Sequence, residues 1–211
     1  MDSSKGLRIV FVRHPETEWG NVKDPESSTK GQRLLGWTDV ALSSIGVERA
    51  SNLSLRFREE GITRIETSPL KRAVLTAQMI AADISVPLVF QEDLREINFG
   101  SCEGLTFEEL ESKFPAVHKA YLAQGSDVVF PEGESFEGFR SRVKRWLNSL
   151  LASHDGETVL VISHGGVIRV ALCLLLDWSP ETFWSLRQDY GGITSIGVYG
   201  DRRIIERING R

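Results

Sequence analysis

Two histidines lie at the ends of segments that the sequence predicts to be buried strands. His14 comes one residue after the apolar run Leu7–Val12, and His164 follows Thr158–Ser163 directly. A neutral imidazole can act as a nucleophile or as a general acid or base. Ligands of open parallel sheets bind beyond the carboxyl ends of the strands. If these two strands are neighbours, His14 and His164 meet in one crevice, although 150 residues separate them in the chain.

Positive charge is placed where it could hold an anion in the same crevice. Arg72 follows Lys71 in the first turn of a helix predicted to begin at Ser68-Pro69. The helix dipole disfavours cations at that end unless an anion offsets the cost. Gly165-Gly166 opens another helix after the second histidine, and backbone N–H groups at a helix start favour negative charge. Together these features predict an anion pocket, in which the planar guanidinium of Arg72 is the better clamp.

The elements that must position these residues alternate between strand-like and helix-like segments. This pattern predicts an α/β fold with three layers, α/β/α, and a mostly parallel central sheet. We expect one domain over residues 1–211, with residues 105–152 forming a mainly helical insert that caps the site. The other expected elements are helices from Ser43 to about Glu60, from 68 to about 84 and from 165 to about 176, and strands at 62–66, 193–199 and 203–208.

Composition excludes several classes of protein. The chain has 211 residues, a net charge of −4 and no block of Lys and Arg, so a broad nucleic-acid-binding surface is not expected. No apolar run approaches the ~20 residues of a membrane-spanning helix. Cys102 and Cys173 are too few for a disulfide framework, which favours reduced thiols in a cytoplasmic protein. The sequence carries no interface signature, so the oligomeric state stays open, with a homodimer as one alternative.

Several short blocks resemble the histidine phosphatases, the phosphoglycerate mutase-like superfamily. They occur in the family's order and cover nearly the whole chain. The blocks are VRHPETEW (12–19), GWTDVAL (36–42), SPLKRA (68–73), LREINFGSCEG (94–104), PEGES (131–135) and SHGG (163–166).

The resemblance implies a phosphomonoester hydrolase that works on a small phosphorylated metabolite without a metal or an organic cofactor. His14 resembles the nucleophile that becomes a phosphohistidine, and Glu96 resembles the carboxyl that acts as acid and base. By the same resemblance, the phosphoryl oxygens are held by Arg13, Arg72 and His164. Neighbouring Glu92 and Glu103 are expected to be structural or on the surface.

Two residues depart from the family pattern. Pro15 stands where glycine usually follows the nucleophile, and proline offers no backbone donor to a phosphate. Gly20 stands where an asparagine often follows the tryptophan of the motif, and Asn21 could supply that phosphate contact after a shift of one residue.

Three alternatives remain from the sequence. A 2,3-bisphosphoglycerate-dependent mutase is less favoured, since only 34 residues separate Glu96 from Pro131 and mutases of the group resemble longer chains. A non-catalytic phosphoprotein-binding module would commonly lack the nucleophile or the acid. A metal hydrolase lacks any metal-ligand spacing among four histidines and two cysteines. Among phosphatases, DYGGIT (189–194) and the His-Pro pair resemble α-ribazole phosphatases.

Overall fold

A six-stranded mixed sheet forms the centre of the computed structural model, which describes residues 6–19, 33–124, 127–153 and 156–210. The strand order is β3-β2-β4-β1-β5-β6. Strands β1, β2, β3 and β4 are parallel, whereas β5 runs antiparallel to both of its neighbours, β1 and β6. The strands are β1 (Leu7–Arg13), β2 (Arg64–Thr67), β3 (Leu88–Phe90), β4 (Thr158–Ser163), β5 (Ile193–Tyr199) and β6 (Arg202–Gly210).

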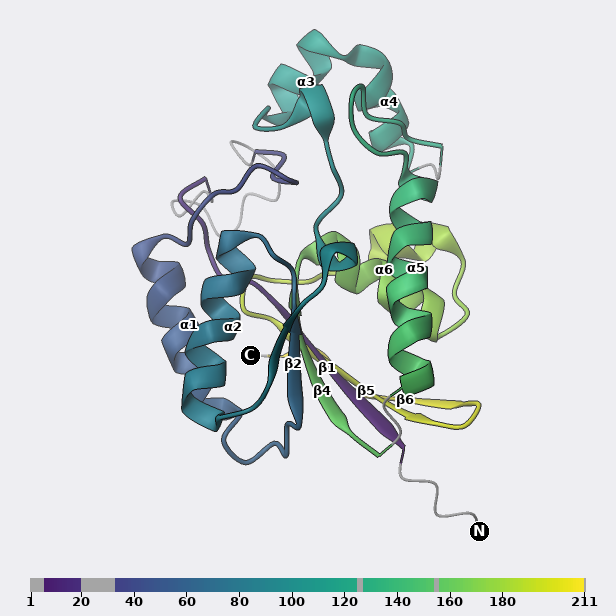
Figure 1. The fold of residues 1–211 in the computed structure, drawn as a ribbon. Helices are drawn as coiled ribbons and strands as arrows, with labels where there is room; N and C mark the ends of the chain where they lie inside the picture. Colours follow the sequence, from purple (N-terminus) through teal and green to yellow (C-terminus); the bar gives the residue numbers. More distant parts are fainter. Residues whose placement is uncertain (1–5, 20–32, 125–126, 154–155, 211) are drawn as a thin grey trace.

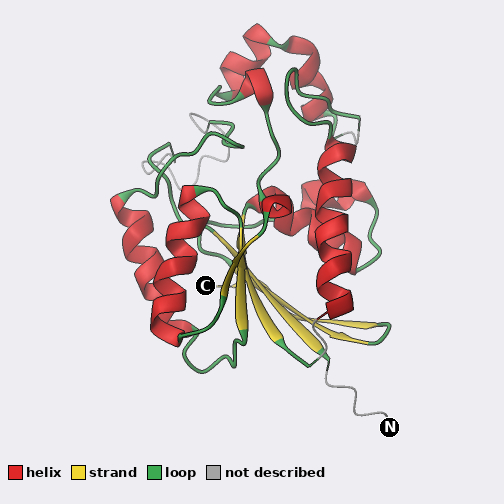
Figure 2. Cartoon of the chain, in the orientation of Figure 1, coloured by secondary structure: helices red, strands yellow, loops and turns green. Residues whose placement is uncertain are grey.

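Helices cover both faces of the sheet, and this confirms the predicted three-layer arrangement (Figure 1). Helices α1 and α2 lie on one face, α5 and α6 lie on the other, and α3 and α4 lie above the carboxyl ends of the parallel strands (Figure 2). The helices are α1 (Ser44–Arg56), α2 (Lys71–Ile84), α3 (Phe107–Lys113), α4 (Pro115–Leu122), α5 (Phe136–Ser153) and α6 (Gly165–Leu175), with 3-10 turns η1 (Glu92–Leu94), η2 (Gly100–Cys102) and η3 (Pro180–Ser185).

Alternation along the central strands builds two apolar cores. Ile9 and Phe11 of β1 face the core beneath α5 and α6, whereas Val10 and Val12 face the core beneath α1 and α2. Strand β4 divides its side chains in the same way. Because both faces are covered, β1 and β4 read as continuous apolar runs in the sequence.

Three predicted boundaries were wrong. Helix α2 begins at Lys71 rather than Ser68, because Leu70, the residue before the helix, has an extended backbone. Helix α1 ends at Arg56 rather than near Glu60, and turns follow it as far as Gly61, which has a φ of +66°. Strand β2 begins two residues later than expected. The predicted cap by Ser43 is confirmed: its side chain accepts a hydrogen bond from the N–H of Gly46 at 3.1 Å.

Two further features bear on the sequence predictions. Cys102 and Cys173 are buried and unbonded. Among the described residues, no helix is both long and apolar enough to cross a membrane.

Candidate active site

Neighbouring strands bring the two strand-terminal histidines together. Strands β1 and β4 pair in parallel, with Arg13 opposite Ser163, and the N–H of His14 donates to the carbonyl of Ser163 at 2.9 Å. The rings of His14 and His164 lie 5.1 Å apart between centroids, in an edge-to-face arrangement. The juxtaposition expected from the sequence is therefore present.

His14 is held in a tautomer that leaves one ring nitrogen available. Its Nδ1 lies 2.7 Å from the carbonyl oxygen of Pro15 and can only donate there, so the lone pair resides on Nε2. Only 4% of the residue is exposed. Burial, followed by the positive charges of Arg72 and Arg13, holds the pKa of His14 well below its usual value. The imidazole is thus neutral at physiological pH. From the sequence, Pro15 was expected only to remove a backbone donor to phosphate. In the structure its carbonyl orients the ring of His14.

One ring nitrogen of His164 contacts a serine hydroxyl, and the other has no hydrogen-bond partner among the described residues. Nε2 of His164 lies 2.8 Å from the hydroxyl of Ser68, which also accepts from the N–H of Leu70 at 3.4 Å. In the tautomer in which Ser68 donates to Nε2, the ring hydrogen of His164 is on Nδ1, an atom that is buried and makes no hydrogen bond among the described residues. Burial, then the charge of Arg72, holds the pKa of His164 well below its usual value.

The two predicted arginines are anchored by backbone carbonyls. Arg13 donates from Nη1 to the carbonyl of Gln188 at 2.7 Å, and its guanidinium stacks 3.9 Å from the ring centroid of Tyr190. Arg72 is fully buried and donates to the carbonyls of Thr38 and Gly36, at 3.0 and 2.6 Å. Burial lowers the pKa of Arg72 to about 10, so the group remains charged at neutral pH. Nε of both arginines is buried and lacks a hydrogen-bond partner within the described structure.

Glu96 lies at the same site, and its contact with the start of α6 explains why residue 166 is a glycine. Its Oε1 accepts from the N–H of Ile97 at 3.0 Å, and Oε2 accepts from the N–H of Gly166 at 2.9 Å. The backbone donor at the start of α6, which the sequence assigned to an anionic ligand, therefore binds a carboxyl of the protein itself. A Cβ on Gly166 would lie 2.2 Å from Oε1 of Glu96, so only glycine fits this approach.

Glu103 fixes the loop that carries the anchors of Arg72. Its carboxylate accepts backbone N–H groups of Gly36, Trp37 and Thr38, at 3.0, 2.7 and 3.3 Å, and that of Phe99 at 3.1 Å. The expectation of a structural role for Glu103 is confirmed. Glu92 pairs instead with Arg95 at 2.8 Å and is largely exposed.

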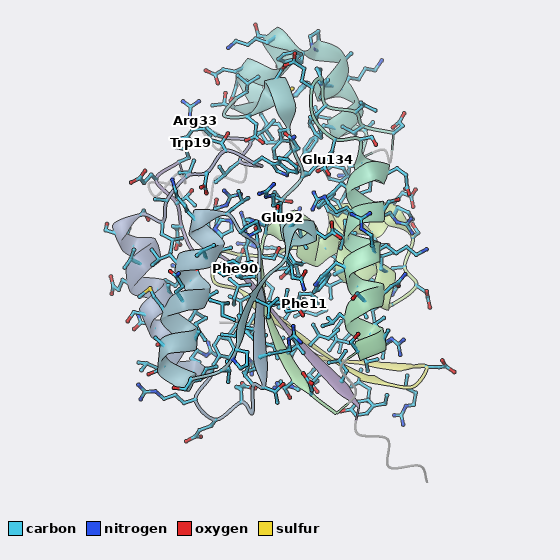
Figure 3. All side chains as sticks on the ribbon, in the orientation of Figure 1. Phe11, Trp19, Arg33, Phe90, Glu92 and Glu134 are labelled. Atoms are coloured by element: carbon cyan, nitrogen blue, oxygen red, sulfur yellow. The ribbon has the colours of Figure 1, made fainter. Side chains whose placement is uncertain are left out.

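Hydrogen bonds from Arg142 support the backbone on which Glu96 lies. Arg142 of α5 donates to the carbonyls of Asp93, Arg95 and Glu96 at 2.8, 2.8 and 3.2 Å, and its guanidinium pairs with Glu134 at 2.8 Å. Figure 3 labels Glu134 beside the N-terminal end of α5. These bonds fix the backbone from which the Glu96 side chain projects.

A cavity of about 320 Å³ opens beside these groups and runs beneath the cap. Its polar end is formed by Arg13, His14, Glu96 and the Gly165-Gly166 backbone. Tyr190 also lines it and lies 5.6 Å from His14 between ring centroids. Its other walls are largely aromatic, contributed by Phe107, Tyr121, Phe130, Phe136, Phe183 and Trp184.

The structure brings five of the six predicted site residues together, and Asn21 lies outside the described residues. Sequence reasoning missed Ser68, Tyr190, Arg142 and Arg169. From the sequence, Ser68 was interpreted only as a helix start, and no role was assigned to Arg169. The position of Arg169 four residues after Gly165 and three after Gly166, on the same helix face, was the available signal for a side chain near the site.

The arrangement is suited to transfer of an anionic group. A neutral, buried imidazole with a free lone pair is a nucleophile. Around it lie two guanidinium groups and an imidazole N–H, all preorganised by the protein, which are the donors that stabilise charge on a transferring phosphoryl group. Among the described residues, no three or more His, Cys, Asp or Glu side chains are grouped to hold a metal ion.

Comparison with known proteins gives the family. A family model described as "Histidine phosphatase superfamily (branch 1)" matches residues 9–211. The chain belongs to this superfamily, and its fold and relatives identify it as a phosphoric monoester hydrolase of the histidine phosphatase type.

Three similar proteins illustrate the match. Phosphoserine phosphatase 1 of Hydrogenobacter thermophilus is 30% identical over 203 residues, which cover 96% of this chain and 92% of that one. A protein named probable phosphoglycerate mutase GpmB, from Proteus mirabilis, is 34% identical over 170 residues, 81% of this chain and 75% of that one. The solved structure of an Escherichia coli K-12 protein, described as a putative alpha-ribazole-5'-P phosphatase, has a TM-score of 0.86, 25% identity and 97% coverage of both chains.

Proposed function

We propose that this protein hydrolyses small phosphomonoesters through a phosphohistidine formed on Nε2 of His14, without a metal ion. The observation that carries the proposal is the bond from Nδ1 of His14 to the carbonyl of Pro15, because it leaves the Nε2 lone pair exposed to the site. Three buried nitrogens without hydrogen-bond partners in the described structure belong to Arg13, Arg72 and His164. Buried polar atoms are nearly always satisfied, so these three support an anionic ligand beside the nucleophile.

The first step transfers the phosphoryl group. Nε2 of His14 attacks phosphorus, the bond between phosphorus and the ester oxygen breaks, and Glu96 gives its proton to the leaving alkoxide. Arg13, Arg72 and Nδ1–H of His164 hold the equatorial oxygens, where charge is spread in the transition state.

The second step regenerates the enzyme. Glu96, now ionised, takes a proton from a water molecule as its oxygen attacks phosphorus, and the bond between phosphorus and Nε2 breaks. Inorganic phosphate leaves, and His14 and Glu96 return to their starting protonation states. Each oxygen of Glu96 keeps a lone pair beyond its bond to a backbone N–H, which suits a group that alternately gives and accepts a proton.

The aromatic underside of residues 105–152 supports their role as a cap that selects the alcohol part of the substrate. The substrate is therefore a small phosphorylated metabolite bound beneath this cap.

The two unbonded thiols support a reducing compartment, the cytoplasm. A homodimer is tested by light scattering of the purified chain.

The test is hydrolysis of p-nitrophenyl phosphate in the presence of EDTA. We expect activity in EDTA, a loss of at least about 10³-fold in His14→Ala, and no such loss in His118→Ala on the cap helix α4. Base-stable, acid-labile phosphohistidine should be trapped in the wild type and not in His14→Ala. Undiminished turnover in His14→Ala would refute the nucleophile, and stoichiometric zinc required for activity would refute the metal-free scheme.

The same preparation distinguishes hydrolase from mutase. With 3-phosphoglycerate and 2,3-bisphosphoglycerate present, a mutase forms the 2-phospho isomer faster than inorganic phosphate. We expect the reverse. Binding of phosphoproteins without any turnover would instead indicate a non-catalytic module.

A further inference from the structure

Arg169 is a cation inside the cavity that the catalytic scheme does not use. It lies on α6 and lines the cavity beside Gly165 and Gly166. Its guanidinium carbon lies 5.4 Å from the ring centroid of Phe183, and its Nε is buried without a hydrogen-bond partner among the described residues. Arg13 and Arg72, by contrast, are tied to backbone carbonyls.

The surroundings of Arg169 offer it little compensation. Burial, followed by the positive charge of Arg13, lowers the pKa of Arg169. Tyr121 and Trp184 form part of the neighbouring wall, with ring centroids 4.8 Å apart. Arg169 is partly exposed, but its Nε is buried, and leaving a buried donor of a charged group without a partner is costly unless an anion joins it.

Charge around the cavity is one-sided. Arg13, Arg33 and Arg169 line it, and Glu96 is the one carboxylate among the described lining residues. Both oxygens of Glu96 are engaged by backbone N–H groups, and the acid–base steps use the same group. The described lining therefore offers no carboxylate that is free to bind a substrate ammonium.

From these contacts we infer that Arg169 binds a carboxylate on the alcohol part of the substrate. The inference rests on the proposed function and narrows it: the preferred substrates are phosphate esters of hydroxy acids, and esters of amino alcohols are disfavoured. Helix α6 sets the spacing, since Gly166 holds Glu96 at the ester oxygen and Arg169 lies three residues further, about 4.5 Å along the axis. The aromatic walls pack against the carbon chain between the two anionic groups.

Arg169 could instead only support η3 through its contact with Phe183. A supporting residue would affect all substrates alike, whereas a residue that binds substrate changes the preference between substrates of different charge. The ratio of kcat/KM values for two esters separates these roles, because a general loss of structure cancels from it.

The experiment measures kcat/KM for three sets of esters of matched length: carboxyalkyl phosphates with one to three methylene groups, neutral alkyl phosphates and aminoalkyl phosphates. We expect the wild type to prefer the carboxyalkyl esters. In Arg169→Met their advantage over the alkyl esters should fall about 10- to 100-fold, mainly through KM, as expected for loss of a charge-assisted hydrogen bond. Arg56→Met, an exposed arginine at the end of α1, is the matched control and should keep the wild-type ratio. Arg169→Lys, which retains the charge, should keep part of the preference.

An unchanged ratio in Arg169→Met, or a wild type that prefers aminoalkyl esters, would overturn the inference while leaving phosphohistidine chemistry intact. If Arg169→Met does not fold, as judged by circular dichroism, the ratio in Arg169→Lys and Arg169→Gln decides: equal ratios in the two would overturn the inference. If no ester is hydrolysed at all, the proposed function fails. Calorimetric binding of carboxyalkyl and alkyl phosphonates to wild type and Arg169→Met then decides the inference separately.

Discussion

Oε2 of Glu96 accepts a hydrogen bond from the backbone N–H of Gly166 at 2.9 Å, so the start of α6 fixes the carboxyl that we propose as acid and base. The close approach is possible because Gly166 has no side chain: a Cβ there would lie 2.2 Å from Oε1. Helix α6 also follows His164 directly and carries Arg169. One helix therefore relates the proposed acid–base carboxyl, His164 and the Arg169 cation that lines the cavity.

Gly166→Ala should displace Glu96 and lower kcat about 10²-fold, because a shift of about 1 Å at a reacting group has effects of this size. Gly138→Ala, in the first turn of α5, is the matched control: its Cβ would meet only the flexible Ser135 hydroxyl, at 3.2 Å. Steady-state kinetics on p-nitrophenyl phosphate measure both. Wild-type kcat in Gly166→Ala would show that Glu96 does not depend on this approach.

Glu96→Gln should lose about 10²- to 10⁴-fold in turnover of alkyl phosphates, since their alkoxide needs a proton in order to leave. The loss of phosphohistidine formation should be much smaller for p-nitrophenyl phosphate, whose leaving group is stable as an anion. Rapid-quench trapping of the intermediate measures this difference. Full turnover of ethyl phosphate by Glu96→Gln would contradict the assignment.

The depressed pKa of His14 has a consequence for stability. Between the folded pKa and about 6.5, unfolded His14 binds a proton that folded His14 does not, so the free energy of unfolding falls as the pH falls below about 6.5. In His14→Gln this contribution is absent. The stability of the wild type should therefore decline more steeply than that of His14→Gln on acidification, by at most about 1.4 kcal/mol per pH unit. Urea unfolding at pH 8 to 5.5 measures the two slopes, and parallel slopes would contradict a depressed pKa.

The lowered pKa of His14 should also determine how kcat/KM depends on pH. Because His14 remains neutral below its usual pKa, protonation of the nucleophile should not reduce kcat/KM for p-nitrophenyl phosphate until well below pH 6.5. The pH profile of the wild type tests this. The result against this prediction is a fall in kcat/KM with a midpoint near pH 6.5. If that midpoint moves in Arg72→Met, which removes one cause of the lowered pKa, the midpoint belongs to His14. The pKa of His14 would then have its ordinary value, and the structure would be contradicted.

Glu103→Gln should destabilise the fold by about 1–3 kcal/mol and weaken substrate binding. An amide oxygen and NH₂ group cannot replace a carboxylate that accepts four backbone N–H groups, so the 36–38 loop that anchors Arg72 loosens. Urea unfolding and the KM for p-nitrophenyl phosphate measure the two effects. Glu111→Gln, exposed on α3, is the control and should match the wild type.

The sequence predicted the parts of this molecule that depend on local pattern and strand topology. The apolar runs before His14 and after Glu157 identified β1 and β4, and the position of both histidines at strand ends predicted their meeting. The charge and position of Arg72 in a first helical turn indicated an anion clamp, and the family motif added Arg13 and Glu96. Each of these residues carries its signal in its immediate neighbours.

What was missed depends on partners distant in the chain. Helix α2 starts three residues late because Ser68 stays outside it and bonds to His164, 96 residues away. Gly166 looked like part of a ligand pocket because the sequence does not show that Glu96 reaches it. Arg169 was hidden because it sits in the most apolar helix, and only the folded cavity shows that its head lies among aromatic rings.

The pairing of β1 with β4 places the beginning and the last third of the chain side by side at the centre of the sheet. During synthesis the ribosome releases His14 long before Ser163 and His164, so a nascent chain contains the nucleophile that we propose without the strand that pairs with β1. Phosphatase activity consequently emerges only when the C-terminal third has docked, and its recovery on refolding reports closure of the whole sheet.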